Sequence, residues 1–385
     1  MNGHRPTSSS LWFLLMMILF IGALSFSFAG CIKKEPIRVG FVAELSGKQA
    51  ELGVQERNAV QLAVDAVNAS GGVVGRQIEL IIRDDLGTPD GAKIADHELI
   101  NAGVVAIIGH ATSKETEAAL PVIDAAHMVM ISPTTSAPQL SGVSKYFFRV
   151  FMTSLPRTQY FAQHIFKSRG LSRIAIIYDT DNAAYTKSFA VAFSNKFQSL
   201  GGKVVAEQGY SSSAKPDFSL LMSKLRATGA EGLVIIASDF DTAIIAQRTR
   251  LIGWRVPLFT SGWAQTDILV NNGGRAVEGL EIEQSYAIDP QSPNYLDFKK
   301  RFETRFGRAP SFGAAFGYET VMVLAAALKK TGGKAEGLRE ALLEIHDFQG
   351  LVDTFSFDKN GDVLRPFYLG AIRDGKFVTS KTYTP

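Results

Sequence analysis

The fold is decided by residues 104–140, which read VVAIIGHATSKETEAALPVIDAAHMVMISPTTSAPQL. Two short apolar runs, Val104–Ile108 and Met128–Ile131, flank the helix-length segment Glu115–Ala126. Apolar residues recur along that segment with the spacing of an amphipathic helix. Strand, helix and strand in this order predict one right-handed βαβ unit of a parallel sheet.

Hydroxyl residues follow both predicted strands. Neighbouring parallel strands end at the same edge of a sheet, and ligands bind in the crevice at that edge. Free backbone N–H groups and a helix N-terminus attract an anion there, so we expect a carboxylate site. The alternative is that these side chains only cap the helix and form turns. They are Thr112, Ser113 and Thr116 after the first strand, and Ser132, Thr134, Thr135 and Ser136 after the second.

Length and composition bound the class of protein. The chain has 385 residues, 46% of them hydrophobic and 20% charged, which suits two domains of about 150 residues each. Its net charge is +3, without a block of like charges or a basic stripe with interleaved aromatics, so no nucleic-acid partner is expected. The single cysteine, Cys31, excludes an internal disulfide and a multi-cysteine metal site.

Residues 1–30 read as a targeting segment, separate from the fold. An apolar, charge-free run, Leu11–Phe28, is followed by Ala29, Gly30 and Cys31. Small residues before a lone cysteine resemble a bacterial lipobox, although Phe28 stands where leucine is usual. This predicts an extracytoplasmic protein, in the periplasm or on the cell surface, held on the membrane by lipid at Cys31. The alternatives are a plain signal peptide or an uncleaved anchor helix.

The remaining chain alternates predicted strands and helices in two series. The first series starts with the strand Ile37–Leu45 and ends at Tyr146–Phe151. The second starts near Ser154 and ends with the run Gly279–Ala287, after which come further helices and two closing strands with hairpin-type turns. We therefore expect an α/β protein of two similar Rossmann-like lobes with open parallel sheets and a cleft between them.

Eight motifs, in order along the chain, resemble the type I periplasmic binding proteins, in the branch typified by the leucine/isoleucine/valine-binding proteins of ABC importers. They are FVAELSG (41–47), DAVNASGGVVGRQIELIIRDD (65–85), AIIGHATS (106–113), ISPTTSAPQL (131–140), FFRV (147–150), RIAIIYD (173–179), AVEGL (276–280) and FDKNGD (357–362). The resemblance implies two lobes joined by a three-crossover hinge and closing on a small molecule. Lobe one is expected at 37–152 plus 287–350, and lobe two at 153–286 plus 351–385.

The resemblance also implies roles for four residues. Ser113, with backbone groups of its loop, matches the serine that holds the ligand carboxylate. Ser136 matches the hydroxyl residue that contacts the α-ammonium group, and Thr134 the residue that gives a main-chain contact. Tyr185 matches the tyrosine of a lobe-two loop that closes over the ligand.

Four positions depart from the family pattern. Trp263 follows a loop in which an acidic residue often binds the ammonium group, and Asp239, at a usually aromatic position, could supply that charge. Leu52 replaces an aromatic residue near the first loop, and Thr112 stands where some relatives have a disulfide cysteine. Trp263 could instead wall a flat aromatic or apolar ligand, or simply pack between the lobes.

Three classes of function follow. The first is a solute-binding lipoprotein that delivers a small carboxylate to an ABC permease, most simply a branched-chain or other apolar amino acid, with an aromatic or other non-amino carboxylate as the alternative. The second is a ligand-sensing module on the same fold. An enzyme is not expected, because the chain lacks G-x-S-x-G, Walker and H-E-x-x-H motifs. No cofactor or metal is expected, and His110 and the Asp84-Asp85 pair are interpreted as structural.

Overall fold

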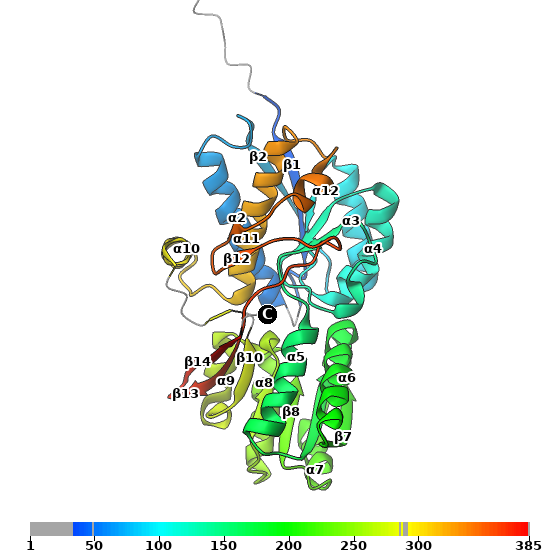
Figure 1. The fold of residues 1–385 in the computed structure, drawn as a ribbon, viewed down its shortest axis with the longest axis vertical. Coiled ribbons are helices and arrows are strands. Elements are labelled where there is room, and N and C mark those ends of the chain that lie inside the picture. The colour runs from blue at the N-terminus through cyan, green and yellow to red at the C-terminus, as the bar shows by residue number, and fades with distance from the viewer. Residues whose placement is uncertain (1–33, 48–49, 285, 288–291, 384–385) are drawn as a thin grey trace, which may run out of the picture. The chain divides into compact units, whose positions relative to one another are not determined.

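The computed structural model describes residues 34–47, 50–284, 286–287 and 292–383. The predicted leader and Cys31 lie outside the described residues. Residues from Pro36 onward form one compact unit, and within it two sheets, each covered by helices, make two lobes (Figure 1). Lobe one is defined here by the five-stranded sheet and the elements packed on it, and lobe two by the seven-stranded sheet.

The sheet of lobe one is parallel, with the strand order β2-β1-β3-β4-β5. The strand–helix–strand unit predicted from residues 104–140 is confirmed: β3 and β4 are parallel neighbours, with Ile107 opposite Met130. The strands are β1 (Ile37–Ala43), β2 (Ile78–Asp84), β3 (Ile107–Ile108), β4 (Met130–Ser132) and β5 (Phe147–Arg149).

Helices cover both faces of this sheet. Helices α3 and α4 pack on one face, and α2 and α11 on the other, because each presents a buried apolar stripe to the strands. Helix α11 is long and apolar enough to cross a membrane, but its apolar surface is mostly buried in the lobe. The helices are α2 (Ala50–Ala69), α3 (Pro89–Asn101), α4 (Ser113–Ala126), η1 (Pro138–Leu140), α10 (Pro293–Phe306), α11 (Phe312–Lys330) and α12 (Leu338–Leu343).

The sheet of lobe two has the order β14-β13-β10-β9-β8-β6-β7. It is parallel from β10 to β7, whereas β13 and β14 form an antiparallel hairpin at one side. Asp374 and Gly375 join these two strands, at one of the hairpin-type turns predicted near the end of the sequence. The strands are β6 (Arg173–Asp179), β7 (Lys203–Tyr210), β8 (Gly232–Ile236), β9 (Leu258–Thr260), β10 (Glu281–Gln284), β13 (Phe367–Arg373) and β14 (Lys376–Tyr383).

Helices also cover both faces of the lobe-two sheet. Helices α5 and α6 share one apolar core with the strands, and α7, α8 and α9 share the other. Helix α9 was not predicted, because its seven residues carry too short an apolar pattern to stand out. The elements are α5 (Ser154–Gln163), η2 (His164–Ser168), η3 (Thr180–Asn182), α6 (Ala183–Ser199), α7 (Phe218–Arg226), α8 (Asp239–Leu251), η4 (Gly262–Ala264), α9 (Asp267–Gly273) and η5 (Gly274–Val277).

The chain passes between the lobes after β5, after β10 and again before β13 (Figure 1). The last passage differs from the expected boundary, because residues 351–366 pack on lobe one rather than lobe two. Phe355, Phe357 and Val363 are buried in its core, and the Phe357 ring lies 5.4 Å from that of Phe148. These apolar side chains follow the short hairpin of β11 (Phe348–Gln349) and β12 (Thr354–Phe355).

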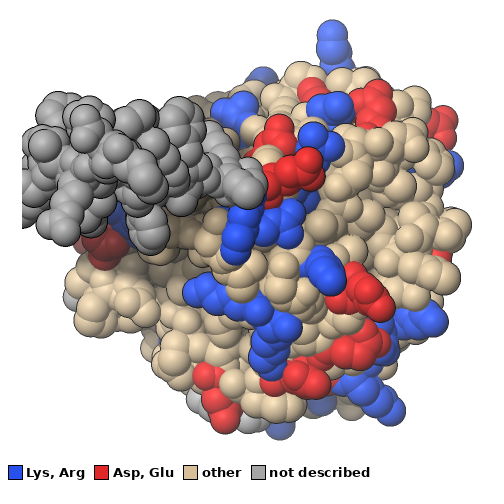
Figure 2. All heavy atoms as spheres, turned by 90° about the horizontal axis from the view of Figure 1, so that it is seen from above, with Lys and Arg blue, Asp and Glu red and all other residues tan. Residues whose placement is uncertain are grey.

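Charge is mixed on the molecular surface. On the face drawn in Figure 2, lysines and arginines lie beside aspartates and glutamates wherever the described residues are visible. Neither sign forms a continuous field there, which agrees with the small net charge of the chain.

Candidate ligand-binding site

A cavity lies between the lobes. Its walls combine hydroxyl groups and apolar residues of lobe one with an aromatic and cationic wall from lobe two. Lobe one contributes Leu52, Ala111, Thr112, Ser113, Thr134, Ser136, Phe151 and Phe312, and lobe two contributes Arg157, Asn182, Tyr185, Gly262 and Trp263.

The structure brings most of the predicted site residues together here. Leu52, Thr112, Ser113, Thr134, Ser136, Tyr185 and Trp263 all line this cavity. Asp239 does not; it lines an adjoining hollow, which shares Leu52, Trp263 and Phe312 with the first. The contacts that each residue makes with a ligand stay predictions.

The N-terminus of α4 carries Ser113 into the cavity. Thr112 precedes it in an extended conformation and gives no side-chain cap to the first turn of the helix. Its hydroxyl instead pairs with the carboxylate of Glu115. The positive end of the helix dipole therefore faces the cavity without a capping side chain, an arrangement suited to an anion.

Most of the hydroxyl residues join the loop after β3 to the loop after β4. Joining the two loops is a third role for these residues, beside the capping and ligand-binding roles considered from the sequence. The resulting hydrogen-bond network holds the lobe-one wall of the cavity in place without a ligand. The Ser132 hydroxyl donates to the His110 carbonyl (2.7 Å), the Thr116 and Thr135 hydroxyls lie 2.7 Å apart, and the Ala137 N–H donates to Ser113 Oγ (3.2 Å).

Thr134 extends this network to a buried glutamate on α2. Its Oγ1 lies 2.7 Å from the carbonyl oxygen of Ala111 and 2.5 Å from Oε1 of Glu56. A carbonyl can only accept, so the single hydroxyl proton goes to Ala111 and Glu56 must donate to Thr134. Burial raises the pKa of Glu56 to about 8, which supplies that proton at neutral pH.

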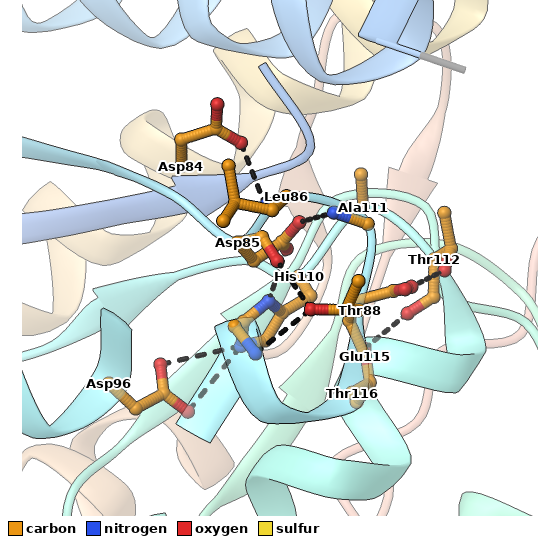
Figure 3. Close-up of polar contacts among 12 residues, drawn as sticks. Asp84, Asp85, Leu86, Thr88, Asp96, His110, Ala111, Thr112, Glu115 and Thr116 are labelled. Carbon is orange, nitrogen blue, oxygen red and sulfur yellow. Dashed lines mark hydrogen bonds and ion pairs between the residues drawn. The ribbon is translucent and has the colours of Figure 1, made fainter. Parts of the chain in front are cut away.

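His110 lies behind the same loop, between two carboxylates (Figure 3). Its Nδ1 is 2.7 Å from Oδ2 of Asp85, and its Nε2 is 3.3 Å from Oδ1 of Asp96. Burial alone would lower the pKa of His110, but Asp96 and Asp85 outweigh it and raise the pKa to about 10. The buried imidazolium holds the ends of β2 and β3 together, as the structural interpretation requires. Among the described residues, no group of three or more potential ligands is arranged to hold a metal ion.

Two aromatic rings form the lobe-two wall. The Tyr185 and Trp263 rings meet edge to face, with centroids 6.1 Å apart and an interplanar angle of 86°. Tyr185 was expected in a loop but lies in the first turn of α6, because that helix begins early, at Ala183. Burial raises the pKa of Tyr185 above its usual value, so the phenol stays neutral.

Arg157, on α5, was missed by the sequence reasoning. Its side chain is buried, with 1% exposed, and Nη1 donates to Oε2 of Glu283 at 2.5 Å. The other oxygen of Glu283 accepts the Gly262 N–H at 3.0 Å. Within the described part of the chain, Nε and Nη2 of Arg157 have no hydrogen-bond partner. In the sequence, Arg157 looks like any cation on the surface of a helix, and no local pattern marks it as buried.

Asp239, at the start of α8, is already engaged within lobe two. Its Oδ2 accepts the Thr266 hydroxyl at 2.5 Å and its Oδ1 accepts the Phe240 N–H at 2.6 Å. Burial raises the pKa of Asp239 above its usual value. The Asp239 carboxylate lines the adjoining hollow and not the first cavity. An ammonium group of the ligand would therefore have to reach into that hollow to contact it.

Known proteins share this architecture. The sequence profile described as "Periplasmic binding protein" matches residues 36–376. A leucine-, isoleucine-, valine-, threonine- and alanine-binding protein of Pseudomonas aeruginosa is 24% identical, over 89% of this chain and 90% of its own length.

Two solved structures have a closely similar fold. The branched-chain amino acid transporter substrate-binding protein LivJ of Streptococcus pneumoniae, in complex with isoleucine, has a TM-score of 0.84 at 23% identity, covering 91% of this chain and 100% of its own. A solute-binding protein of an ABC transporter from Rhodopseudomonas palustris, in complex with 3,4-dihydroxybenzoic acid, has a TM-score of 0.81 at 24% identity, covering 91% and 97%.

These likenesses confirm the predicted fold class, two α/β lobes of the type I periplasmic binding protein fold. They also confirm the resemblance drawn from the sequence motifs. With its profile match spanning nearly all of the two-lobed unit, this chain belongs to the periplasmic binding protein family.

Proposed function

We propose that this chain is the solute-binding component of an ABC importer and closes around a small carboxylate ligand. The observation that carries the proposal is the cavity between the lobes, where Ser113 at the N-terminus of α4 faces the Tyr185–Trp263 wall. A ligand that contacts both walls stabilises the closed arrangement, which an ABC permease distinguishes from the open one. The relatives are binding proteins, which supports a role other than catalysis.

The proposed roles follow the walls of the cavity. Ser113 and the first turn of α4 hold the carboxylate, and the main chain at Thr134 and the hydroxyl of Ser136 contact the rest of the polar end. Tyr185 closes over the ligand from lobe two. Leu52 and Thr112 complete the lobe-one side.

The first candidate for the ligand is an amino acid with a branched or other apolar side chain. The leucine-, isoleucine-, valine-, threonine- and alanine-binding relative supports it, and Asp239 is the carboxylate proposed to face the ammonium group. The second candidate is an aromatic or other carboxylate without an amino group. It is favoured by the engaged oxygens of Asp239 and by the aromatic wall, and a structural neighbour binds 3,4-dihydroxybenzoic acid.

The cellular location and the protein partner are proposed from the membership of the periplasmic binding protein family. The mature chain works outside the cytoplasm, lipid-anchored at Cys31, and passes its ligand to the membrane subunits of a permease.

The proposed lobes have the following bounds. Lobe one comprises 37–152 and 287–350 together with 351–366, and lobe two comprises 153–286 and 367–385. Ligand-induced closure occurs about the three passages between them.

A thermal-shift screen of the purified protein tests the proposal. The panel holds branched-chain, aromatic and small polar amino acids, and the same carbon skeletons without the amino group. A ligand at a hundredfold excess over its Kd stabilises the folded state by about 2.7 kcal/mol. Shifts with amino acids alone support the first candidate, and shifts with des-amino acids alone support the second. If neither these acids nor dicarboxylates raise the melting temperature, the transport proposal is contradicted.

A further inference from the structure

We propose that Arg157 binds a second carboxylate of the ligand, separate from the one at Ser113, so that the solute is a dicarboxylate. This inference rests on the proposed function and narrows its ligand class. It starts from a buried cation in the cavity wall whose hydrogen-bonding capacity the protein uses only in part.

The protein holds Arg157 by one nitrogen. Nη1 donates to Glu283, whose second oxygen is taken by the N–H of Gly262. The guanidinium carbon also lies 5.2 Å from the centre of the Phe151 ring, which supports one face of the group. Held on one edge and one face, the guanidinium has a fixed orientation in the wall of the cavity.

The remaining edge has the shape of a carboxylate site. In a guanidinium, the Nε–H and one N–H of Nη2 point in the same direction and match the two oxygens of a carboxylate. In Arg157 these two nitrogens are buried and, among the described residues, without a partner. Buried unpaired donors cost free energy in a dry cavity, so a ligand that supplies both acceptors is favoured over one that does not.

Gly262 lets the backbone lie close to the ion pair of Arg157 and Glu283. A Cβ at this position would lie 2.9 Å from the backbone oxygen of Glu283 and 3.6 Å from Nη1 of Arg157. Any larger residue would crowd the ion pair and the cavity that it lines. Glycine at position 262 therefore preserves the ion pair that orients Arg157.

The polar groups around the cavity favour a second anion over an ammonium group. Ser113 and the dipole of α4 attract one carboxylate in lobe one. Glu283 balances the charge of Arg157 in lobe two, but the two unpartnered donors of Arg157 suit the oxygens of another carboxylate. Among the described residues that line this cavity there is no aspartate or glutamate, and both oxygens of nearby Glu283 are engaged. A ligand with one carboxylate would occupy either the Ser113 site or the Arg157 site and leave the other without an anion.

Calorimetric titration of the full protein with matched acids tests the inference. The pairs differ by one carboxylate: benzoate against phthalate, isophthalate and terephthalate, hexanoate against adipate, and norvaline against glutamate. We expect at least one diacid to bind about 10- to 100-fold more tightly than its monoacid partner, the range given by charge-assisted hydrogen bonds. Arg157→Lys keeps the charge but loses the planar fork, and we expect it to abolish that preference.

Two further variants separate binding from folding. Arg157→Gln combined with Glu283→Gln removes both charges of the buried pair, so the loss of diacid preference can be measured without a buried unpaired carboxylate. Arg169→Gln removes an exposed guanidinium that follows η2 and pairs with Glu281 outside the cavity, and it should keep the preference.

The outcomes distinguish the two proposals. Equal or tighter binding of monoacids, unchanged in Arg157→Lys, overturns the second carboxylate site and leaves the solute-binding function standing. Binding of no acid at all overturns the proposed function and this inference with it. A diacid preference that Arg157→Lys and the double variant remove, and Arg169→Gln does not, supports the inference.

Discussion

Nδ1 of His110 lies 2.7 Å from Oδ2 of Asp85, in a part of lobe one where neither side chain reaches solvent. Asp85 follows β2 and His110 follows β3, so this contact joins two strand ends at the edge of the sheet that carries the cavity. The loop held by His110 continues directly into Ser113 and α4. The position of the proposed carboxylate site therefore depends on a charged contact behind it.

This contact predicts a dependence of stability on pH. Because the folded-state pKa of His110 is raised from 6.5 to about 10, the stabilisation is complete below pH 6.5 and is lost as the pH rises through 10. Between pH 8 and 10 we expect the free energy of unfolding to fall by about 1.4 kcal/mol per pH unit from this group. Urea denaturation across that range measures the slope, and His110→Gln should flatten it. A slope that is the same in the variant would contradict the assignment.

The raised pKa of Glu56 predicts a second pH range in which the stability of the protein changes. The folded protein holds its proton up to about pH 8, whereas the unfolded chain releases it near 4.5, so stability falls between these values as the pH rises. Glu56→Gln retains a donor for Thr134 and cannot ionise. We expect this variant to be more stable than the parent at pH 9, by chemical denaturation, and to lack the slope between pH 5 and 6.5. The control Glu79→Gln, at an exposed site, should keep it.

The aromatic wall predicts an effect on affinity. Removing the indole by Trp263→Ala deletes the edge-to-face contact with Tyr185 and one side of the cavity. We expect the Kd for whichever acid binds to rise about tenfold or more, and Trp263→Phe to recover most of that loss. Titration calorimetry on both variants decides this, and an unchanged Kd in Trp263→Ala would assign the indole to packing between the lobes alone.

The third passage between the lobes is anchored by another buried arginine. Arg149, at the end of β5, donates from Nε to Oδ1 of Asp362 at 2.6 Å and from Nη1 to the Ala137 carbonyl at 2.9 Å. Breaking the pair by Arg149→Met should lower the free energy of unfolding by about 3–5 kcal/mol, because Asp362 loses its counter-charge. Combining it with Asp362→Leu should restore part of that loss. Thermal and urea unfolding of the single and double variants measure the difference.

Local sequence signals predicted most of the fold. The βαβ unit at 104–140 was clear because the strand and helix patterns there are separated by obvious breaks, and β3, α4 and β4 follow it closely. The place of the hydroxyl residues at the cavity was also predictable, since it follows from the edge at which parallel strands end. Their mutual hydrogen bonds were not, because the pairing of Thr116 with Thr135 depends on how two loops meet in space.

The missed features are those set by distant parts of the chain. Arg157 is buried only because Glu283, on β10, lies beside it, a separation of 126 residues that no local pattern records. Residues 351–366 were assigned to the wrong lobe. The sequence shows that Phe355 and Phe357 are apolar, but it does not show which of the two lobe cores these side chains enter. Asp239 lies in the neighbouring hollow, where Thr266 and Phe240 donate to its oxygens, and its contact with a ligand stays a prediction.

The hydrogen bonds among the lobe-one hydroxyls give the two walls of the cleft unequal tolerance to substitution. Ser132, Thr134 and Thr135 hold the loops to each other, so a change there alters the frame as well as the binding surface. Trp263 and Arg157 line the cavity from the other side without carrying those loops. A biosensor for a new organic acid is therefore best engineered by leaving the lobe-one frame intact and varying the wall that lobe two contributes.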